Sequence, residues 1–120
     1  FRHFLCGMAQ GADLYFCQAV LDLRQRHPEV TLEAAIPFAG QADHWSAADQ
    51  RRRMTLLDQC DLETVVQHTY TPGCMNRRNR YMVDHASLLI AVHDGLPGGT
   101  RRTIEYALRR GIGIVDIPVG

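Results

Sequence analysis

Short apolar runs alternate with amphipathic helical patterns along the whole chain, and this alternation constrains the fold more than any other feature. The run at residues 87–93, SLLIAVH, is nearly continuous, as is typical of a buried parallel strand. The pattern predicts strands at residues 3–6, 31–36, 63–67, 87–93 and 112–117, and helices at 12–26, 46–60, 74 to about 85, and 100–110. Strands that alternate with helices pair in parallel through right-handed crossovers, so we expect an α/β fold.

Length and charge limit the classes of protein to which the chain can belong. One hundred and twenty residues suffice for one domain with a real core, so we expect a single domain at residues 1–120. Thirteen cations balance thirteen anions, whereas a dedicated binder of duplex nucleic acid usually carries a basic excess. No apolar run approaches the ~18 residues of a membrane span. We therefore expect a cytoplasmic protein that binds neither duplex nucleic acid nor a membrane.

The cysteines and histidines show no spacing that is typical of a metal site. The four cysteines, Cys6, Cys17, Cys60 and Cys74, include no C-x-x-C pair, which also argues against a disulfide framework and favours a reducing compartment. The chain lacks a G-x-S-x-G elbow, a Walker A lysine and a full G-x-G-x-x-G. We therefore predict no metal and no cofactor, and we exclude serine hydrolases, P-loop NTPases and ordinary nicotinamide dehydrogenases.

The sixteen residues 70–85, YTPGCMNRRNRYMVDH, carry an unusual helix start. A Thr-Pro-Gly turn precedes the helix, and Arg77, Arg78 and Arg80 fall in its first two turns. The positive end of the helix dipole disfavours cations there by ~0.3–1 kcal/mol each. A helix start with free N–H groups and added cations is suited to holding an anion. We interpret the segment as part of a site for a phosphate-bearing ligand, with Arg77 and Arg80 as its contacts.

A glycine-containing loop, GMAQGAD at residues 7–13, follows the first predicted strand. Gly7 and Gly11 would let backbone N–H groups approach a phosphate or a sugar closely. Asp13 could accept ribose hydroxyl groups or act as a carboxylate base. In the alternative interpretation, the glycines only make a tight turn and Asp13 only complements the helix dipole. The pattern alone does not decide between the two.

The loop at residues 94–102, DGLPGGTRR, repeats the anomaly of the arginine-rich helix. Gly98 and Gly99 form a flexible entry, and we expect Thr100 to cap the helix that follows. Arg101 and Arg102 then occupy the first turn, against the dipole. Either this start also holds an anion, or a carboxylate or solvent neutralises the arginines.

Four stretches of the sequence together resemble a known family. They are GMAQGADL at residues 7–14, AAIPF at 34–38, the sixteen residues 70–85, and LLIAVHDGLPGGTRRTIEYA from position 88 onward. They resemble the YpsA-like family of the SLOG superfamily, the group that includes the DprA/Smf proteins and the Lonely Guy phosphoribohydrolases, and the resemblance implies a bacterial protein. The stretch at 70–85 is the specific one, because glycine loops are shared across the superfamily.

The resemblance implies a Rossmann-like, three-layer α/β/α fold with a mainly parallel sheet of about five strands. It also implies that a nucleotide or a nucleotide-derived ligand lies over Gly7, Gly11, Asp13 and residues 98–100. Lonely Guy enzymes carry a PGG-x-GT-x-x-E signature. This chain has only PGGT at residues 97–100, and Glu105 stands two residues further from the threonine than that glutamate does.

Family members also begin with a strand, a T-G-H-R-P-like loop and a helix, and this opening has no counterpart in the 120 residues. By resemblance, that strand lies in the middle of the sheet beside residues 3–6. We therefore expect a domain that is truncated at its N-terminus relative to the family, with unpaired strand edges, an incomplete cleft and weakened ligand binding.

Two hypotheses about function follow. In the first, the chain is a nucleotide-binding module that acts as a sensor through a protein partner or a homo-oligomer. In the second, it hydrolyses or transfers at the N-glycosidic bond of nucleoside monophosphates, with Asp13 or Glu105 as the catalytic carboxylate. Both expect Asp13, Arg77, Arg80 and Gly99 to face one cleft.

Overall fold

The computed structural model describes residues 2–93 and 98–118, and strands and helices alternate through them. The elements in chain order are β1 (His3–Cys6), α1 (Ala12–Arg26), β2 (Thr31–Phe38), α2 (Ala47–Leu57), β3 (Leu62–Gln67), α3 (Cys74–Asp84), β4 (Leu88–His93), α4 (Gly99–Arg110) and β5 (Gly113–Pro118). All the described strand pairs are parallel. The structure thus confirms a Rossmann-like α/β fold.

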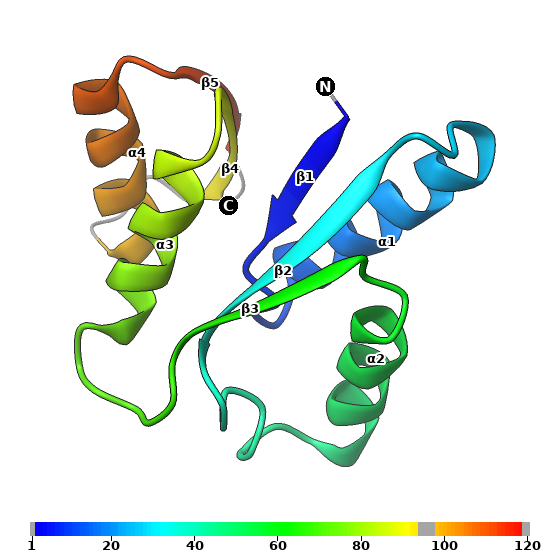
Figure 1. Cartoon of the computed structure of the whole chain (residues 1–120). Coiled ribbons are helices and arrows are strands. Elements are labelled where there is room, and N and C mark those ends of the chain that lie inside the picture. The colour runs from blue at the N-terminus through cyan, green and yellow to red at the C-terminus, as the bar shows by residue number, and fades with distance from the viewer. Residues whose placement is uncertain (1, 94–97, 119–120) are drawn as a thin grey trace.

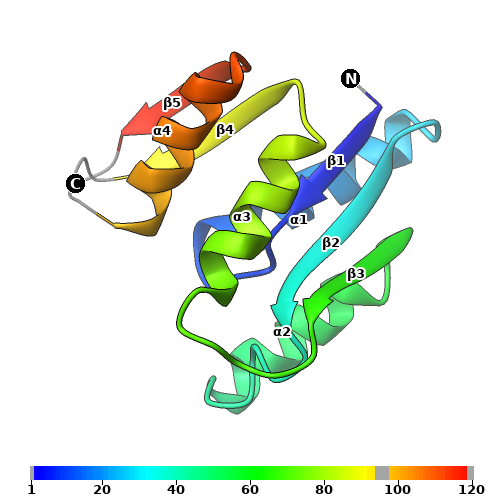
Figure 2. The same ribbon diagram turned by 60° about the vertical axis from the view of Figure 1, so that its left-hand side comes forward.

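The strands form two sheets, where we expected one sheet of about five strands. One sheet has the order β1-β2-β3, and the other consists of β4 and β5. β1 and β4 point the same way, and within the described residues neither has a strand on its second side (Figures 1 and 2).

Helices cover both faces of the three-stranded sheet. α1 and α2 lie on one face, and α3 lies across the other (Figure 2). α4 packs beside α3 and against β4 and β5, so that α3 links the two sheets. No helix in the described part of the chain is long and apolar enough to cross a membrane.

β2 is the centre of the core because it is the middle strand and both of its faces are covered. Its side chains alternate: Leu32 and Ile36 are buried in the cluster formed with α1 and α2. Glu33 points to the opposite face, where it meets α3. Apolar residues on α1, such as Leu14 and Cys17, complete the cluster. This arrangement reflects the period of two in a strand and of 3.6 in a helix.

Several expected element boundaries differ from those of the structure, most of all the end of the second helix, which we expected at residue 60 and which lies at Leu57. We expected Pro37 to stop the second strand, yet β2 continues to Phe38. β1 ends opposite Ala34, so no strand on that side requires an N–H group from Pro37. We also expected Thr100 to cap α4, but the cap residue is Gly98, and α4 begins at Gly99. Gly98 enters the helix through extended backbone and provides no side-chain cap.

Candidate functional site

A cavity of about 640 Å³ lies at the loop that follows β1 and continues between β1 and β4. At one end it is lined by Gly7, Ala9 and Asp13 from the loop and the start of α1. Arg78 from α3 and Thr100 from the first turn of α4 line it as well. The cavity therefore collects residues that are far apart in sequence at the carboxyl end of a parallel strand, where ligands of such sheets bind.

Arg78 and Asp13 meet over Gly7. A Cβ atom on Gly7 would lie 2.7 Å from Nη1 of Arg78 and 2.9 Å from Oδ2 of Asp13. Nη1 of Arg78 donates a hydrogen bond to the carbonyl of Gly7, and Nε2 of Gln41 donates to the same carbonyl at 3.0 Å. Gly7 is thus required by the close approach of two side chains, because any larger residue would push them apart.

Burial controls the charge state of the pair. Burial raises the pKa of Asp13, and a hydrogen bond from the N–H of Ala9 (3.2 Å) and the charge of Arg78 partly oppose that rise. Burial also lowers the pKa of Arg78, which is only 5% exposed, and the Asp13 carboxylate opposes that change. A desolvated carboxylate in a cavity beside a fixed cation is a frequent feature of binding and catalytic sites.

The loop between β1 and α1 has an unusual backbone. Met8 has φ +56° although it is not a glycine, and its side chain is fully buried. Residues with positive φ are held in place by surrounding structure and cluster at functional sites. α1 then starts from Gly11 at φ +82° with no side-chain cap. The first N–H groups of α1 therefore have no side-chain acceptor at the cavity, as an anion site requires.

α4 starts in the same way. Its cap residue, Gly98, offers no side chain, and Thr100 lines the cavity whereas Gly98 and Gly99 do not. The neighbouring residues 94–97, which include part of the predicted PGGT loop, lie outside the described residues. Two helix starts without side-chain caps thus lie at one cavity: α1 follows β1 of the first sheet, and α4 follows β4 of the second.

Arg77 and Arg80 do not line this cavity. They line a second one of about 680 Å³ between α3 and β3. Arg77 donates to Oε1 of Gln67 at 3.2 Å, and the guanidinium of Arg80 lies 5.2 Å from the ring centre of Tyr106. The expectation that both arginines share one cleft with Asp13 is therefore wrong. Successive helix positions are about 100° apart, so Arg78 points towards Gly7 while Arg77 and Arg80 lie on a different side of α3, next to β3.

From the sequence, we counted Arg78 with Arg77 and Arg80 at the helix start but did not predict it as a ligand contact. The signal for its orientation is helical spacing: Cys74, four residues earlier, is also buried, and so is Val83. Glu105, by contrast, was a predicted catalytic carboxylate but lies away from the cavity. Its side chain is 53% exposed, lies 3.5 Å from Nε of Arg101, and does not line the cavity.

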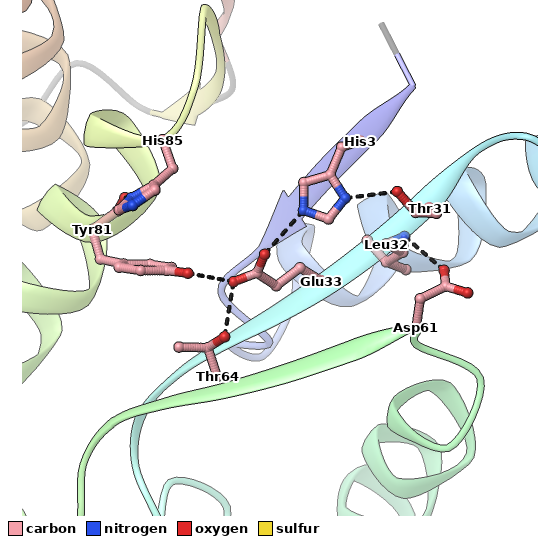
Figure 3. Close-up of polar contacts among 8 residues, drawn as sticks. All are labelled: His3, Thr31, Leu32, Glu33, Asp61, Thr64, Tyr81 and His85. Atoms are coloured by element: carbon pink, nitrogen blue, oxygen red, sulfur yellow. Dashed lines mark hydrogen bonds and ion pairs between the residues drawn. The ribbon is translucent and has the colours of Figure 1, made fainter.

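A second polar cluster, which the sequence did not reveal, lies under α3 (Figure 3). Its centre is the carboxylate of Glu33 on β2, which accepts hydrogen bonds from three side chains. Tyr81 donates through its hydroxyl at 2.5 Å, Thr64 through its hydroxyl at 2.8 Å, and His3 through Nε2 at 2.9 Å. Burial opposes ionisation of Glu33, but the hydrogen bonds outweigh it and lower the pKa. A single acidic residue in an apolar strand gave no indication of this cluster, because its partners come from β1, β3 and α3.

The described residues contain no group of three or more His, Cys, Asp or Glu side chains arranged to hold a metal ion. The polar side chains that line the cavity include Asp13, Arg78, Asn79, Thr100 and Thr103. A carboxylate that accepts and an arginine that donates hydrogen bonds are together suited to a ligand with hydroxyl groups and a negative charge.

Comparison with known proteins gives a family and several relatives. The family model described as "YspA SLOG family" matches residues 1–109. The chain is 32% identical over 122 aligned residues to the "Uncharacterized SPbeta prophage-derived protein YoqJ" of Bacillus subtilis, covering 92% of this chain and 71% of that protein. It is 26% identical to the UPF0398 protein BH1768 of Halalkalibacterium halodurans, covering 89% of this chain and 58% of that protein. It is 27% identical to the UPF0398 protein SH1465 of Staphylococcus haemolyticus, covering 82% of this chain and 54% of that protein. The chain thus spans little more than half the length of these UPF0398 relatives.

Proposed function

The chain belongs to the YpsA family of SLOG proteins, and from this premise we propose that it binds a nucleotide or a nucleotide-derived, phosphate-bearing ligand. The ligand occupies the cavity of about 640 Å³, and the chain reports its presence to a protein partner. Of the predicted ligand-binding residues, Gly7, Asp13 and Thr100 line this cavity, whereas Gly11, Gly98 and Gly99 do not.

One observation carries the proposal: two helix starts without side-chain caps and the Asp13–Arg78 pair lie at the same cavity. Backbone N–H groups at a helix start favour an anion, which assigns the phosphate to the starts of α1 and α4. A buried carboxylate is an acceptor for sugar hydroxyl groups, which assigns the ribose to Asp13. The two assignments together describe a nucleoside phosphate.

Calorimetry with adenosine monophosphate (AMP) and adenosine tests the assignment. We expect AMP to bind and adenosine to bind at least about tenfold more weakly, because adenosine lacks the anion that the helix starts favour. Inorganic phosphate in excess should compete with AMP. Equal affinity for AMP and adenosine would contradict a phosphate site.

A charge placed at the start of α4 tests where the phosphate lies. Thr100→Asp puts a carboxylate into the cavity, and we expect it to weaken AMP binding by about tenfold or more through repulsion of like charges. Thr69→Asp is the matched control, because Thr69 is exposed and lines neither cavity. The same loss in both variants would show that the effect is not local.

The predicted role of Arg77 and Arg80 needs its own test, because both line the other cavity. Arg77→Ala and Arg80→Ala should leave AMP affinity unchanged if the phosphate lies at the starts of α1 and α4. A loss of about tenfold in either variant would instead place the phosphate between α3 and β3.

The burial of Asp13 favours a second candidate function, hydrolysis of the N-glycosidic bond. A carboxylate with a raised pKa is suited to take a proton from water. The water oxygen would bond to the anomeric carbon, the bond from that carbon to the base nitrogen would break, and the base would leave with a proton. Base release from AMP, followed by chromatography, detects this reaction directly.

Paired variants identify the carboxylate. Asp13→Asn should abolish base release, whereas Asp22→Asn on the exposed side of α1 should not. Glu105→Gln tests the other predicted carboxylate, and its exposed position predicts unchanged turnover. AMP binding without any base release would assign the chain to the binding function alone.

A further inference from the structure

The cavity of about 680 Å³ between α3 and β3 is not used by the proposed function. His85 alone lines both this cavity and the one at Gly7. β3 contributes residues 64–66, and the remaining lining residues belong to α3 or lie next to it. Figure 3 shows three of the lining residues, Thr64 on β3 and Tyr81 and His85 at the far end of α3. The cavity is therefore a separate place at which a ligand can bind.

One face of α3 forms the polar wall of this cavity. Gly73, Arg77, Arg80 and Asp84 follow one another at intervals of four, three and four residues, and all of them line the cavity. Residues at this spacing lie on one side of a helix, with Cβ atoms of neighbours about 5–6 Å apart. Both guanidinium groups therefore lie at the same cavity, and Asn76 lines it beside them.

Neither arginine forms an ion pair with a carboxylate of the described residues. Nη1 of Arg77 donates to the neutral amide oxygen of Gln67 at 3.2 Å. The guanidinium of Arg80 lies 5.2 Å from the ring centre of Tyr106, which is also neutral. Both arginines are exposed, so a ligand from solvent can reach them. Two positive charges at one cavity are thus left without a counter-ion from the described part of the chain.

The acidic residue of the cavity does not neutralise them. Asp84 accepts a hydrogen bond from the hydroxyl of Tyr106 at 2.6 Å, and its carboxylate lies 3.4 Å from Nε of Arg110. The guanidinium of Arg109 lies 5.8 Å from the ring centre of Tyr106. Arg80, Arg109 and Arg110 therefore lie around a single carboxylate. The surroundings of the cavity keep an excess of positive charge, which favours a ligand with more than one negative charge.

We propose that the cavity between α3 and β3 binds a diphosphate group, with Arg77 contacting one phosphate and Arg80 the other. A guanidinium binds a phosphate through two parallel hydrogen bonds, so two arginines one turn apart match two linked phosphates. The volume lies within the range of about 300–1,000 Å³ that is usual for small-molecule sites. The proposal goes beyond the proposed function and does not depend on it, because it concerns a second cavity with its own ligand.

Nuclear magnetic resonance titration of the full 120-residue chain tests the proposal, because it reports on each cavity separately. We expect pyrophosphate to shift the Nε–H signals of Arg77 and Arg80 until they saturate. Inorganic phosphate should bind there at least about tenfold more weakly, because it offers one phosphate to two arginines. Signals at Gly7 and the start of α1 report on the first cavity, so a failure of the proposed function would be seen there and not at the arginines.

Adenosine diphosphate (ADP) is the third probe, because free pyrophosphate and organic diphosphates share the same chemistry. Tighter binding of ADP than of pyrophosphate at Arg77 and Arg80 would identify an organic diphosphate as the ligand class. Tighter binding of pyrophosphate would identify the free ion. Both results support a diphosphate site.

Three results of the titration would overturn the proposal. Equal affinity for phosphate and pyrophosphate would remove the assignment of two phosphates. The absence of any shift at Arg77 and Arg80 would remove the site. Equal shifts at Arg26 and Arg51, which are exposed and line neither cavity, would show a general attraction of anions to arginines.

A pair of double variants tests the site from the side of the protein. Arg77→Gln combined with Arg80→Gln removes both charges from the cavity and should weaken pyrophosphate binding by at least about tenfold. Arg26→Gln combined with Arg51→Gln makes the same change in net charge at two exposed positions outside both cavities, so it should bind as the parent chain does. Equal loss in the two double variants would show that net charge alone governs binding, and would overturn the proposal.

Discussion

At the scale of single residues, Gly7 connects the backbone of the site to its charged groups. Gly7→Ala would place a Cβ atom 2.7 Å from Nη1 and 2.8 Å from Cζ of Arg78. Because the guanidinium is buried, it cannot move aside freely, and we expect a loss of about 1–3 kcal/mol in the free energy of unfolding, together with weaker AMP binding. Urea denaturation and calorimetry measure the two effects.

Gly73→Ala is the matched control for this change. A Cβ atom on Gly73 would meet nothing within 4 Å, and its φ is −94°, which any residue can adopt. We expect its free energy of unfolding to stay within about 0.5 kcal/mol of the parent value. Equal destabilisation by the two substitutions would show that crowding at Arg78 is not the cause.

Glu33 supports a prediction about pH. Glu33→Gln removes the carboxylate that accepts from Tyr81, Thr64 and His3, and should lower the free energy of unfolding by about 1–3 kcal/mol at pH 7. Because folding lowers the pKa of Glu33, its contribution is present above the ordinary value of 4.5 and is lost as the pH falls through the lower folded value. Urea denaturation between pH 7 and pH 3 should therefore show the two proteins converging in acid.

Glu29→Gln is the control for the loss of a carboxylate elsewhere. Glu29 is 52% exposed in its side chain and should contribute little at any pH. A difference between parent and Glu33→Gln that stays constant down to pH 3 would contradict the role assigned to the Glu33 charge.

At the scale of elements, the start of α2 shows what a side-chain cap contributes. Oγ of Ser46 accepts a hydrogen bond from the N–H of Asp49 at 3.2 Å. Ser46→Ala should lower the free energy of unfolding by about 1 kcal/mol, whereas Ser46→Asp should retain the cap and most of the stability. Thermal denaturation of the two variants checks this, and equal loss in both would argue against capping.

The elements themselves could largely be predicted, because strand and helix patterns are local. The ends of the strands were harder to predict from the sequence. Pro37 remains in β2 because β1, the neighbouring strand, ends before it, and the local sequence around Pro37 does not show where β1 ends. The orientation of α3 was missed for the same reason. Helical spacing gives the faces of a helix, but only packing on β2 decides that Arg78 turns inward while Arg77 and Arg80 line another cavity.

The residues of the candidate site also differ in how well local sequence patterns could predict them. Gly7, Asp13 and Thr100 line one cavity, as the sequence led us to expect, because the ends of parallel strands and the helix starts after them meet at one edge of a sheet; that they bind a ligand stays a prediction. The cluster around Glu33 was not expected, since its hydrogen bonds join four elements that no local pattern connects. Long-range polar contacts of this kind depend on the assembled fold.

At the scale of the whole molecule, the two sheets differ in how well they are enclosed. Among the described residues, β2 has a strand on each side and helices on both faces, whereas β4 pairs only with β5 and Ile90 on it is 40% exposed. We expect amides of β2 to exchange with solvent at least about tenfold more slowly than amides of β4, measured by hydrogen exchange at neutral pH. Equal protection of β2 and β4 would contradict this order.

The hydrogen bond from Arg78 to the carbonyl of Gly7 spans 71 residues of sequence. Closing so long a loop costs conformational entropy, so this contact depends on the rest of the fold to hold its two ends together. If the proposed ligand binds beside this contact, it would bind folded molecules only and so stabilise them against unfolding. In a cell, proteases remove the unfolded fraction, so the supply of ligand would set how long each copy of the protein survives. The amount of protein would then record the ligand's history as well as its present concentration.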